Sequence, residues 1–253
     1  MTLADALRMT ADESVALVGG GGKTTAMFRL ARETVDRGGC AITTTTTRIF
    51  GAQIALAPAH VAAADATRER IAAALAVHRH VLVIGPTEPG SGKAEGISLD
   101  LFHRLRAWFP EACLLNEADG SRMRPFKAPA DYEPVIPPET TLVVPVVGAD
   151  ALGALLDAEH VHRPELVSAL SGAPIGARIT PAIVARVLAH PEGGRKGVPV
   201  DARVVVLINK VDALPDRATA RETAACLLRE PAIQRVVLAN LRGEEPVLEV
   251  CVR

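Results

Sequence analysis

Residues 19–25 of the chain, "GGGGKTT", place four glycines directly before a lysine and two threonines. The run follows an apolar stretch, "VALV", and leads into a helix-like stretch that ends at Gly38. This context is typical of a phosphate-binding loop, because glycine backbones and a helix N-terminus present N–H groups to anionic oxygens. Lys23 would neutralise β/γ-phosphate charge, and the Thr24 hydroxyl would hold Mg²⁺. A plain glycine turn is the alternative, which the immediate Lys-Thr-Thr disfavours.

The glycine spacing departs from the usual phosphate loop, which has a further glycine where this chain has Leu17. The shorter pattern GxxGK[ST] is that of the compact phosphate loop of the Mur-ligase and folyl-ligase type. A tighter loop can still present its amides to a phosphate. We therefore expect nucleotide contacts from Gly19, Gly20, Gly21, Gly22, Lys23, Thr24 and Thr25.

A second Gly-Lys pair lies in "IGPTEPGSGKAEG", residues 84–96. Here Ala94 stands at the position of the metal-binding hydroxyl, and Thr87 replaces the first glycine. We expect a loop at this place, either mobile or facing a substrate.

Two acidic residues follow another apolar stretch, in "ACLLNEADG" at 112–120. Alternation along an extended chain places Glu117 and Asp119 on one face. A phosphoryl-transfer site with Mg²⁺ needs a carboxylate at a strand end, where it organises the metal shell or the attacking water. We expect Glu117 and Asp119 to join Lys23 in catalysis and Thr24 in metal binding, with solvated surface acids as the alternative.

The sequence "VVVLINKVDAL" adds a base-reading motif after a strongly apolar stretch. In the NKxD motif of GTPases the Asp carboxylate, here Asp212, accepts from N1–H and the exocyclic amine of guanine, while Asn209 and Lys210 shape the pocket. "RVVLAN" and Leu241 would add a closing loop beneath the base. A chance match at a turn is the alternative. The strand context and the order along the chain favour GTP over ATP.

Two polar segments supply candidate substrate contacts. Thr46, Thr47 or Arg48, at the end of a threonine run, would reach the γ-phosphate or Mg²⁺, unless the threonines only favour a strand. A second segment follows the acidic pair and is stiffened by prolines, so that its polar side chains would lie over the phosphates or a small anionic substrate. These side chains are Ser121, Arg122, Arg124 and Lys127. A basic surface loop is the alternative.

A pair of histidines occurs in "EHVHRPE". His160 and His162 could share a metal only on an extended segment, and no third ligand stands beside them. We expect a structural or substrate-contacting role for them.

The elements that must position these residues alternate along the chain. Apolar, β-rich runs occur at 14–19, 40–46, 80–85, 112–117, 141–148, 203–209 and 235–240. Helix-like stretches occur at 23–36, 61–78, 179–190 and 216–229. The alternation predicts an α/β fold of the P-loop NTPase type, with a mostly parallel sheet, helices on both faces and ligands at the carboxyl ends of the strands.

Two segments interrupt this alternation. Residues 120–140 hold five of the 18 prolines, which predicts a loop without helix, ordered or disordered. Residues 191–200 predict a second loop. No linker composition forces a division, so we expect a single nucleotide-binding domain over residues 1–253 with an insertion at about 120–140.

Composition excludes several classes of protein. The net charge of −1 gives no general attraction to nucleic acid or to an anionic membrane. No uninterrupted apolar stretch has membrane-spanning length, and the N-terminus lacks a signal-type apolar core. Cys40, Cys113, Cys226 and Cys251 form no CxxC, which predicts free thiols in a reducing compartment. We expect a cytoplasmic protein with a small-molecule or protein partner.

Several motifs occur in a particular order, namely "GGGGKTT", "ITTTTTRIF", "NEADGSRMRPFKAP", "EPVIP", "HRPE" and "LINKVD". Together they resemble the YqeC family of accessory proteins for selenium-dependent molybdenum hydroxylases, over about residues 15–212. The resemblance implies functional roles for 19–25, the acidic pair, 120–129 and 209–212. It also implies a pathway, the maturation of a molybdenum hydroxylase or of its selenium-containing cofactor.

These observations predict a Mg²⁺-dependent nucleoside triphosphatase that binds GTP or ATP, with GTP favoured. Its substrate or partner would be a small anionic molecule, a selenium-containing molybdenum cofactor or a molybdenum hydroxylase. One alternative is an ATP-dependent kinase or ligase that holds a small anionic substrate with Arg122, Arg124 and Lys127. Another is a non-catalytic delivery protein whose nucleotide switches its affinity for a partner.

Overall fold

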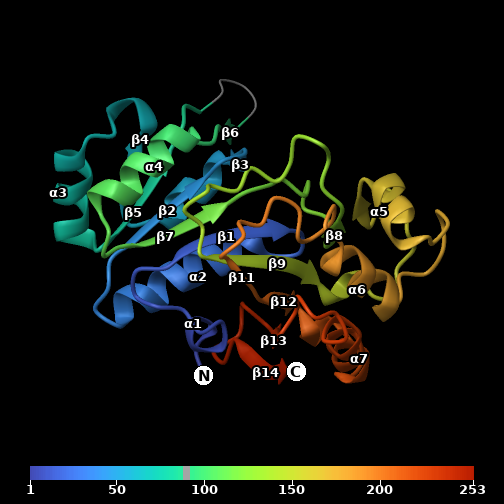
Figure 1. Ribbon diagram of the computed structural model, residues 1–253. Coiled ribbons are helices and arrows are strands. Elements are labelled where there is room, and N and C mark those ends of the chain that lie inside the picture. The colour runs from blue at the N-terminus through green and yellow to red at the C-terminus, as the bar shows by residue number, and fades with distance from the viewer. Residues whose placement is uncertain (88–91) are drawn as a thin grey trace.

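The centre of the molecule is a large, mostly parallel β-sheet (Figure 1). The computed structural model describes residues 1–87 and 92–253. In chain order the strands of the sheet are β1 (Ser14–Gly19), β2 (Ala41–Thr45), β4 (His60–Ala62), β5 (His80–Ile84), β7 (Cys113–Glu117), β9 (Leu142–Gly148), β11 (Arg203–Val204), β12 (Val206–Asn209), β13 (Arg235–Ala239) and β14 (Val247–Val252).

The strands are ordered β14-β13-β12-β9-β1-β7-β2-β5-β4, and β11 pairs with β9. Within the described residues every pairing in this sheet is parallel except that of β13 with β14. Consequently β1, β7, β9 and β12 end at the same edge, and the residues that follow them meet there.

Helices connect most of these strands. The helices are α1 (Leu3–Ala6), α2 (Lys23–Asp36), α3 (Arg68–His78), α4 (Leu99–Trp108), α5 (Pro164–Ser171), α6 (Pro181–Ala189) and α7 (Ala218–Leu227). The chain also forms short 3₁₀ helices, namely η1 (Gly51–Leu56), η2 (Ala63–Asp65), η3 (Ala149–Ala151) and η4 (Val211–Ala213). Two small sheets pair β3 (Ile49–Phe50) with β6 (Lys93–Ala94), and β8 (Phe126–Lys127) with β10 (Val161–His162).

Helices cover both faces of the sheet because successive side chains of each strand point to opposite faces. Leu17 of β1 packs with α1 and α2 in one apolar cluster. On the other face, Leu114 of β7 packs with α3 and α4, and Ile208 of β12 packs with α6 and α7. All five residues of β7 are buried, as a strand covered on both faces requires.

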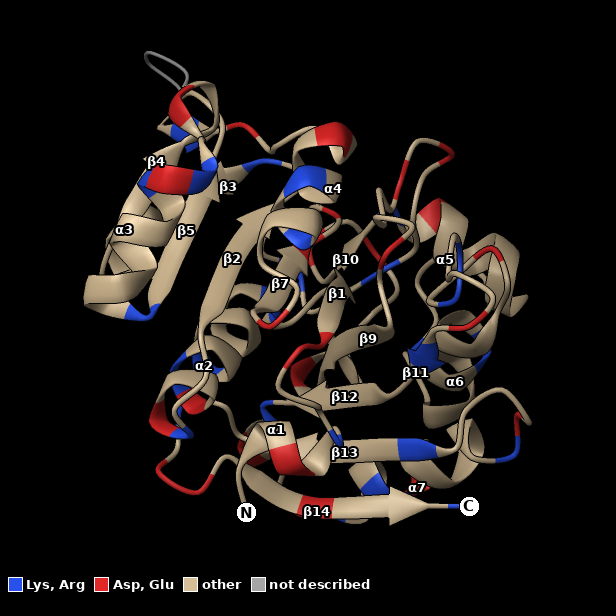
Figure 2. Ribbon diagram, turned by 60° about the vertical axis from the view of Figure 1, so that its left-hand side comes forward, with Lys and Arg blue, Asp and Glu red and all other residues tan. Residues whose placement is uncertain are grey.

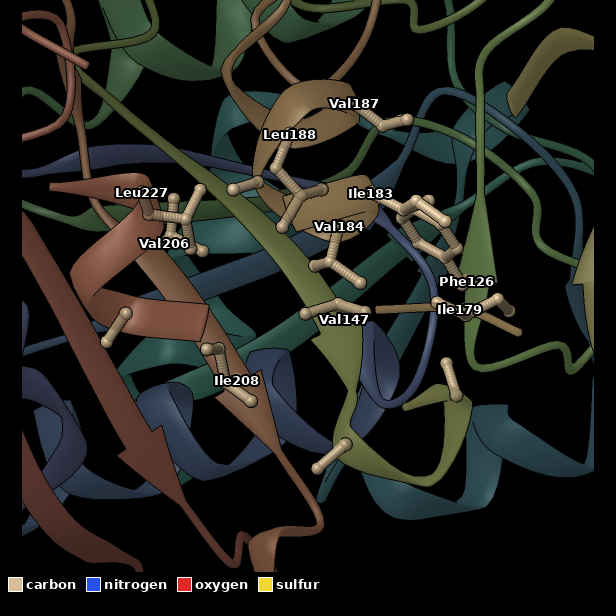
Figure 3. Packing of buried hydrophobic residues seen from close by; sticks show 14 of the residues in the cluster. Phe126, Val147, Ile179, Ile183, Val184, Val187, Leu188, Val206, Ile208 and Leu227 are labelled. Carbon is tan, nitrogen blue, oxygen red and sulfur yellow. The ribbon is translucent and has the colours of Figure 1, made fainter. Parts of the chain in front are cut away.

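Figure 3 shows the packing on the second of these faces. Val147 of β9 and Ile208 of β12 lie beneath Val184 and Leu188 of α6, with Leu227 of α7 beside them. Phe126, which is fully buried, joins the same cluster. The segment after β7 is therefore anchored in the core on the face of the sheet that α6 and α7 cover.

The predicted fold class is confirmed as mixed α/β with a mostly parallel sheet. The predicted strands agree with the observed ones to within one residue at most ends, although Val205 divides 203–209 into β11 and β12. The helix predicted at 61–78 is wrong in its first half, where β4 ends and η2 precedes α3. Residues 120–140 contain no helix, as their prolines require, but they do form β8.

Candidate functional site

A cavity of about 710 Å³ opens at the carboxyl-end edge of the sheet. It is bordered by the turn from β1 into α2, by Glu117 at the end of β7, and by residues after β2, β12 and β13. Its lining residues are Gly21, Gly22, Lys23, Thr24, Thr25, Thr47, Arg48, Ile49, Phe50, Gln53, Lys93, Glu117, Gly120, Ser121, Arg122, Met123, Asn209, Lys210, Asp212, Ala213, Asn240, Arg242 and Gly243. The predicted phosphate loop, acidic strand end and base-reading motif thus share one cavity.

The four glycines are fixed by close approaches of other backbone segments. At Gly19 (φ +94°) a Cβ would lie 2.4 Å from the Val146 carbonyl oxygen, and at Gly21 (φ +79°) it would lie 2.1 Å from the Gly148 nitrogen. A Cβ on Gly20 would lie 2.6 Å from the carbonyl oxygen of Arg124. The run is therefore a tightly packed turn and cannot be a flexible connection.

The amides of this turn divide into two groups. Gly19 N–H donates to the Asp119 carboxylate at 3.0 Å, Gly20 N–H to the Val146 carbonyl at 2.9 Å, and Gly21 N–H to the Arg124 carbonyl at 3.2 Å. These three amides hold the turn in place through bonds within the protein. The prediction that they bind a phosphate is therefore corrected to a structural role. The first helical bond of α2 is made by Ala26 N–H to the Gly22 carbonyl at 2.9 Å. The amides of residues 22–25 precede that bond and form the helix N-terminus at the cavity.

Lys23 lies between the turn and the end of β7. Its side chain is 3% exposed, and Nζ donates to the Gly19 carbonyl at 2.6 Å. Nζ lies 3.2 Å from Asp119 Oδ1 and 3.6 Å from Glu117 Oε1. Burial lowers the pKa of Lys23, but Asp119 and Glu117 outweigh burial, and the net pKa is raised. Lys23 therefore remains an ammonium ion at the floor of the cavity.

Glu117 links Lys23 to the start of α2. Its Oε2 accepts a hydrogen bond of 2.7 Å from the Thr24 hydroxyl. Burial raises the pKa of Glu117 above its ordinary value, against the opposing effects of Lys23 and Thr24. Thr24 and Glu117 both line the cavity and provide hard oxygen donors, which suit Mg²⁺. In the part of the chain that the structure describes, no three His, Cys, Asp or Glu residues are grouped as a metal site.

Asp119 occupies a different position from Glu117. It is 2% exposed, does not line the cavity of about 710 Å³, and contacts Gly19 N–H, Lys23 and the Nζ of Lys127, the last at 3.0 Å. Both acids reach Lys23, as alternation along the strand predicted. However, the carboxylate of Asp119 is enclosed by its cationic partners, so we correct its predicted metal-binding role to one of positioning the turn and Lys23.

Lys127 belongs to the same buried network. Its Nζ donates to the Gly120 carbonyl at 2.7 Å and contacts Glu133. Glu133 in turn accepts from Arg163 at 2.9 and 3.1 Å. Burial favours the neutral acid, but Arg163 and Lys127 outweigh it and lower the pKa of Glu133. The network joins the floor of the cavity to the residue that caps α5.

The predicted substrate-binding residues between 121 and 127 therefore fall into two groups, those that line the cavity and those that do not. Ser121 and Arg122 line the cavity. Lys127 is buried in the ion-pair network, and Arg124 does not line the cavity but contributes its backbone carbonyl to Gly21. The prediction that the Arg124 and Lys127 side chains contact a ligand in the cavity is therefore wrong. The strand β8 directs Lys127 toward the core.

The residues at the end of the threonine run, after β2, also differ in whether they reach the cavity. The Thr46 hydroxyl donates to the Val135 carbonyl at 2.6 Å and accepts from Asn116 at 3.1 Å, which corrects its expected contact with a phosphate. Thr47 and Arg48 line the cavity, and so does Lys93 from the second Gly-Lys pair. Residues 88–91 of that predicted loop lie outside the described residues.

The predicted base-reading motif, residues 209–212, borders the cavity at the end away from β2. Asn209 is buried, and its amide donates to the Gly21 carbonyl at 2.8 Å while its Oδ1 accepts from Leu241 N–H at 3.1 Å. Lys210 lines the cavity and pairs with Asp150 at 2.7 Å. Asp212 is exposed and lines the cavity. The structure thus brings the predicted closing loop against the motif.

Arg29 supports this end and was missed by the sequence analysis. From the second turn of α2 it donates to the carbonyls of Leu241 at 2.9 Å and Gly243 at 2.7 Å. Asn240, Arg242 and Gly243 line the cavity beside it. Arg29 and its partners are more than 200 residues apart in the sequence, so no local sequence pattern indicates these hydrogen bonds.

The histidine pair gives no metal site. His160 Nδ1 lies 2.8 Å from Asp157, and His162 belongs to β10. The four cysteines are free thiols, as predicted.

The mostly parallel sheet with helices on both faces defines a mixed α/β protein, an architecture that P-loop NTPases share. The sequence profile of the family described as YqeC protein matches residues 15–165, more than half of the chain. The chain therefore belongs to the YqeC family, which confirms the resemblance. It is 29% identical over 242 residues to "Uncharacterized protein YqeC" of Escherichia coli (strain K12), covering 92% of this chain and 89% of that protein. Among the described residues, no helix has the length and apolar character to cross a membrane.

Proposed function

We propose that this protein binds and hydrolyses a nucleoside triphosphate, preferably GTP, with Mg²⁺, and that it serves the maturation of selenium-dependent molybdenum hydroxylases. One observation carries the nucleotide part, namely that residues 21–25, Glu117 and Asp212 line the same cavity. The pathway part is supported by the family resemblance.

The chemistry follows from the positions of the side chains. The amides of residues 22–25 and the Lys23 ammonium would bind phosphate oxygens and stabilise the charge that develops on them. An entering phosphate would compete with Glu117 for Lys23, which frees that carboxylate to bind Mg²⁺ or one of the water molecules on it. Mg²⁺, held by Thr24 and Glu117, would neutralise phosphate charge when bound. Asp212 would accept from the guanine edge.

Binding of GTP, ATP and CTP to the purified chain tests the nucleotide. GTP should bind at least about tenfold more tightly than ATP, since the Asp212 carboxylate would accept two hydrogen bonds from guanine and none from adenine. ATP binding equal to or tighter than GTP binding, and unchanged by Asp212→Asn, would refute the GTPase assignment. Turnover measured with and without a selenium-containing molybdenum hydroxylase then tests the pathway.

A second candidate is an ATP-dependent kinase or ligase. It is favoured by the length of the cavity, because β2 and β12 lie on opposite sides of β1 in the sheet, and the lining continues past the glycine turn to Arg48 and Arg122 after β2 and β7. Such a second end could hold an anionic acceptor. Acceptor-dependent ATP consumption that is lost in Arg122→Gln would select this candidate. A kinase would yield ADP and a phosphorylated acceptor, and a ligase would yield ADP, inorganic phosphate and a joined product.

A further inference from the structure

A second cavity, of about 880 Å³, lies at the opposite edge of the sheet. Arg203 and Arg235 line it as the first residues of β11 and β13, so the cavity is at the amino ends of the parallel strands. Its arginines are Arg8, Arg195, Arg203, Arg235 and Arg253. We call it the arginine cavity. Figure 2 shows basic residues at the end of β13 that lies beside the C-terminus.

The end of α1 orients two of these guanidinium groups. Arg235 Nη1 donates to the Ala6 carbonyl at 3.4 Å, and Arg203 donates to the carbonyls of Leu7 at 3.4 Å and Arg8 at 3.2 Å. Ala6 is the last residue of α1, and Leu7 and Arg8 follow it, so these carbonyls are free of helical hydrogen bonds and can accept from the guanidinium groups. On the other side, Arg195 Nη1 donates to the Ala189 carbonyl at 3.4 Å. Contacts from α1 and from the end of α6 thus hold arginines around one space.

The arginine cavity concentrates positive charge in a chain whose net charge is −1. No Asp or Glu lines it within the described part of the chain. The nearby Glu13 pairs with Arg203 at 2.7 Å and also accepts from Thr141. Burial, together with the charges of Arg8 and Arg203, lowers the pKa of Arg235. Each guanidinium has five N–H donors, and the contact of Arg235 with Ala6 uses one of them.

The remaining lining is largely apolar. It consists of Pro191, Val198, Pro199, Val200, Ala202, Val204, Val205, Ala232 and Val252, with Gln234. Guanidinium groups bind phosphates through paired N–H donors and also stack on flat rings. Cavities of about 300–1,000 Å³ are the size that holds small molecules.

We propose that the arginine cavity binds a small molecule in which two or more phosphate groups are attached to an apolar or ring-bearing body. The phosphates would lie against Arg8, Arg203 and Arg235, and the body along the valine and proline residues. The hollow shape favours a small molecule over an acidic protein surface. This site is separate from the candidate nucleotide site, because the two lie at opposite edges of the sheet.

The test uses the full chain carrying Lys23→Ala, so that phosphate binding at the glycine turn is removed, and circular dichroism first verifies the fold because this substitution unpairs Glu117 and Asp119. If that chain does not fold, the wild-type chain takes its place and should bind two equivalents of ADP, one of which is weakened by Arg8→Gln. Calorimetry at fixed low salt would measure inorganic pyrophosphate, ADP as a diphosphate with a body, and adenosine as a body without phosphate. We expect one equivalent of ADP to bind more tightly than pyrophosphate, with no measurable adenosine binding. Adding Arg8→Gln and Arg235→Gln should weaken ADP at least about tenfold, because charge-assisted hydrogen bonds are lost.

Arg229→Gln, at an exposed arginine outside this cavity, is the matched control and should bind as the parent does. If the double variant does not fold, Arg8→Gln alone, at an exposed position, should still weaken ADP at least about threefold. Absence of binding to the Lys23→Ala chain, or equal affinity in the arginine variants and the Arg229→Gln control, would overturn the proposal. Equal affinity for pyrophosphate and ADP would overturn its apolar part.

Discussion

Asn209 donates a hydrogen bond of 2.8 Å from its side-chain amide to the backbone carbonyl of Gly21, across 188 residues of sequence. Its oxygen accepts from Leu241 N–H at 3.1 Å. The neighbouring Gly22 has no room for a side chain, because a Cβ would lie 2.3 Å from Asn209 Nδ2. The turn before α2 and the loops after β12 and β13 are therefore one connected unit.

Asn209→Ala should destabilise the protein by about 1–3 kcal/mol, because it leaves a buried carbonyl and a buried amide without partners. It should also weaken GTP binding, since the loop around Leu241 loses its attachment. Chemical denaturation and nucleotide titration measure the two effects. Asn240→Ala, at a less buried position of the cavity wall, is the control. Equal stability of both variants would contradict the bridging role.

Lys23→Ala should abolish nucleotide turnover and destabilise the protein by about 3–5 kcal/mol, because Glu117 and Asp119 would remain buried without their shared cation. Lys127→Met provides a matched comparison, since Lys127 contacts Asp119 but does not line the cavity. It should destabilise the protein while folded molecules keep their turnover. Turnover that persists in Lys23→Ala would disprove the assignment of the turn as a phosphate loop.

Asp212→Asn should exchange the base preference and leave the fold intact, because Asp212 is exposed. An amide donor in place of the carboxylate repels the exocyclic amine of guanine and suits the corresponding carbonyl of xanthine. GTP affinity should fall by about 100-fold, the loss of two charge-assisted hydrogen bonds, and xanthosine triphosphate affinity should rise. Unchanged GTP affinity would show that Asp212 does not contact the base.

Thr24→Ala should raise the Mg²⁺ concentration needed for half-maximal turnover by about tenfold or more, since one hard oxygen donor is lost. Thr24→Ser keeps the hydroxyl that donates to Glu117 and should restore the wild-type requirement. A Mg²⁺ titration of turnover compares the three proteins. If the serine variant behaves like the alanine variant, the hydroxyl is not the relevant group.

Acidification should destabilise the protein through the buried His80 and the half-buried His162. Burial lowers the pKa of His80 to about 4, from 6.5. The unfolded chain therefore binds more protons between these values, and the stability from neutral His80 is present above pH 6.5 and lost as pH falls toward 4. His162, whose pKa burial and nearby Arg163 and Lys127 also lower to about 4, acts in the same direction.

His80→Gln should remove the proton uptake of His80 on unfolding, which is at most about one proton. The free energy of unfolding should then change less steeply with pH, by up to about 1.4 kcal/mol per pH unit between pH 4 and 6.5. Denaturation midpoints at pH 7 and pH 4.5 measure it. His78→Gln, at an exposed position, should leave the dependence unchanged. Identical slopes for wild type and His80→Gln would show that His80 is not the titrating group.

The sequence predicted the central strands well because parallel strands covered on both faces are continuously apolar. All residues of β9 and β7 are buried, and their boundaries follow from the apolar runs. By contrast, β14 was not predicted. Most of its residues are half-buried at the antiparallel edge of the sheet, so its sequence lacks the continuous apolar run of the central strands. The strand β4 was hidden inside an alanine-rich stretch that favours helix.

Within the candidate site, residue type was predictable but orientation was not. Arg122 and Lys127 belong to one basic segment, yet pairing of β8 with β10 buries Lys127 while Arg122 stays exposed. Glu117 and Asp119 satisfy the same alternation, but β7 ends at Glu117 and the chain then turns. Only the folded chain shows which acid faces the cavity.

The four glycines before Lys23 also bear on how the chain folds. Their backbones are packed against Val146, Arg124, Gly148 and Asn209, all more than 100 positions further along the chain. Contacts that distant cannot form until the intervening segments have been brought together. We therefore expect the turn to take its final shape late in folding, so that a nucleotide that recognises this turn would report on the integrity of the segments packed against it.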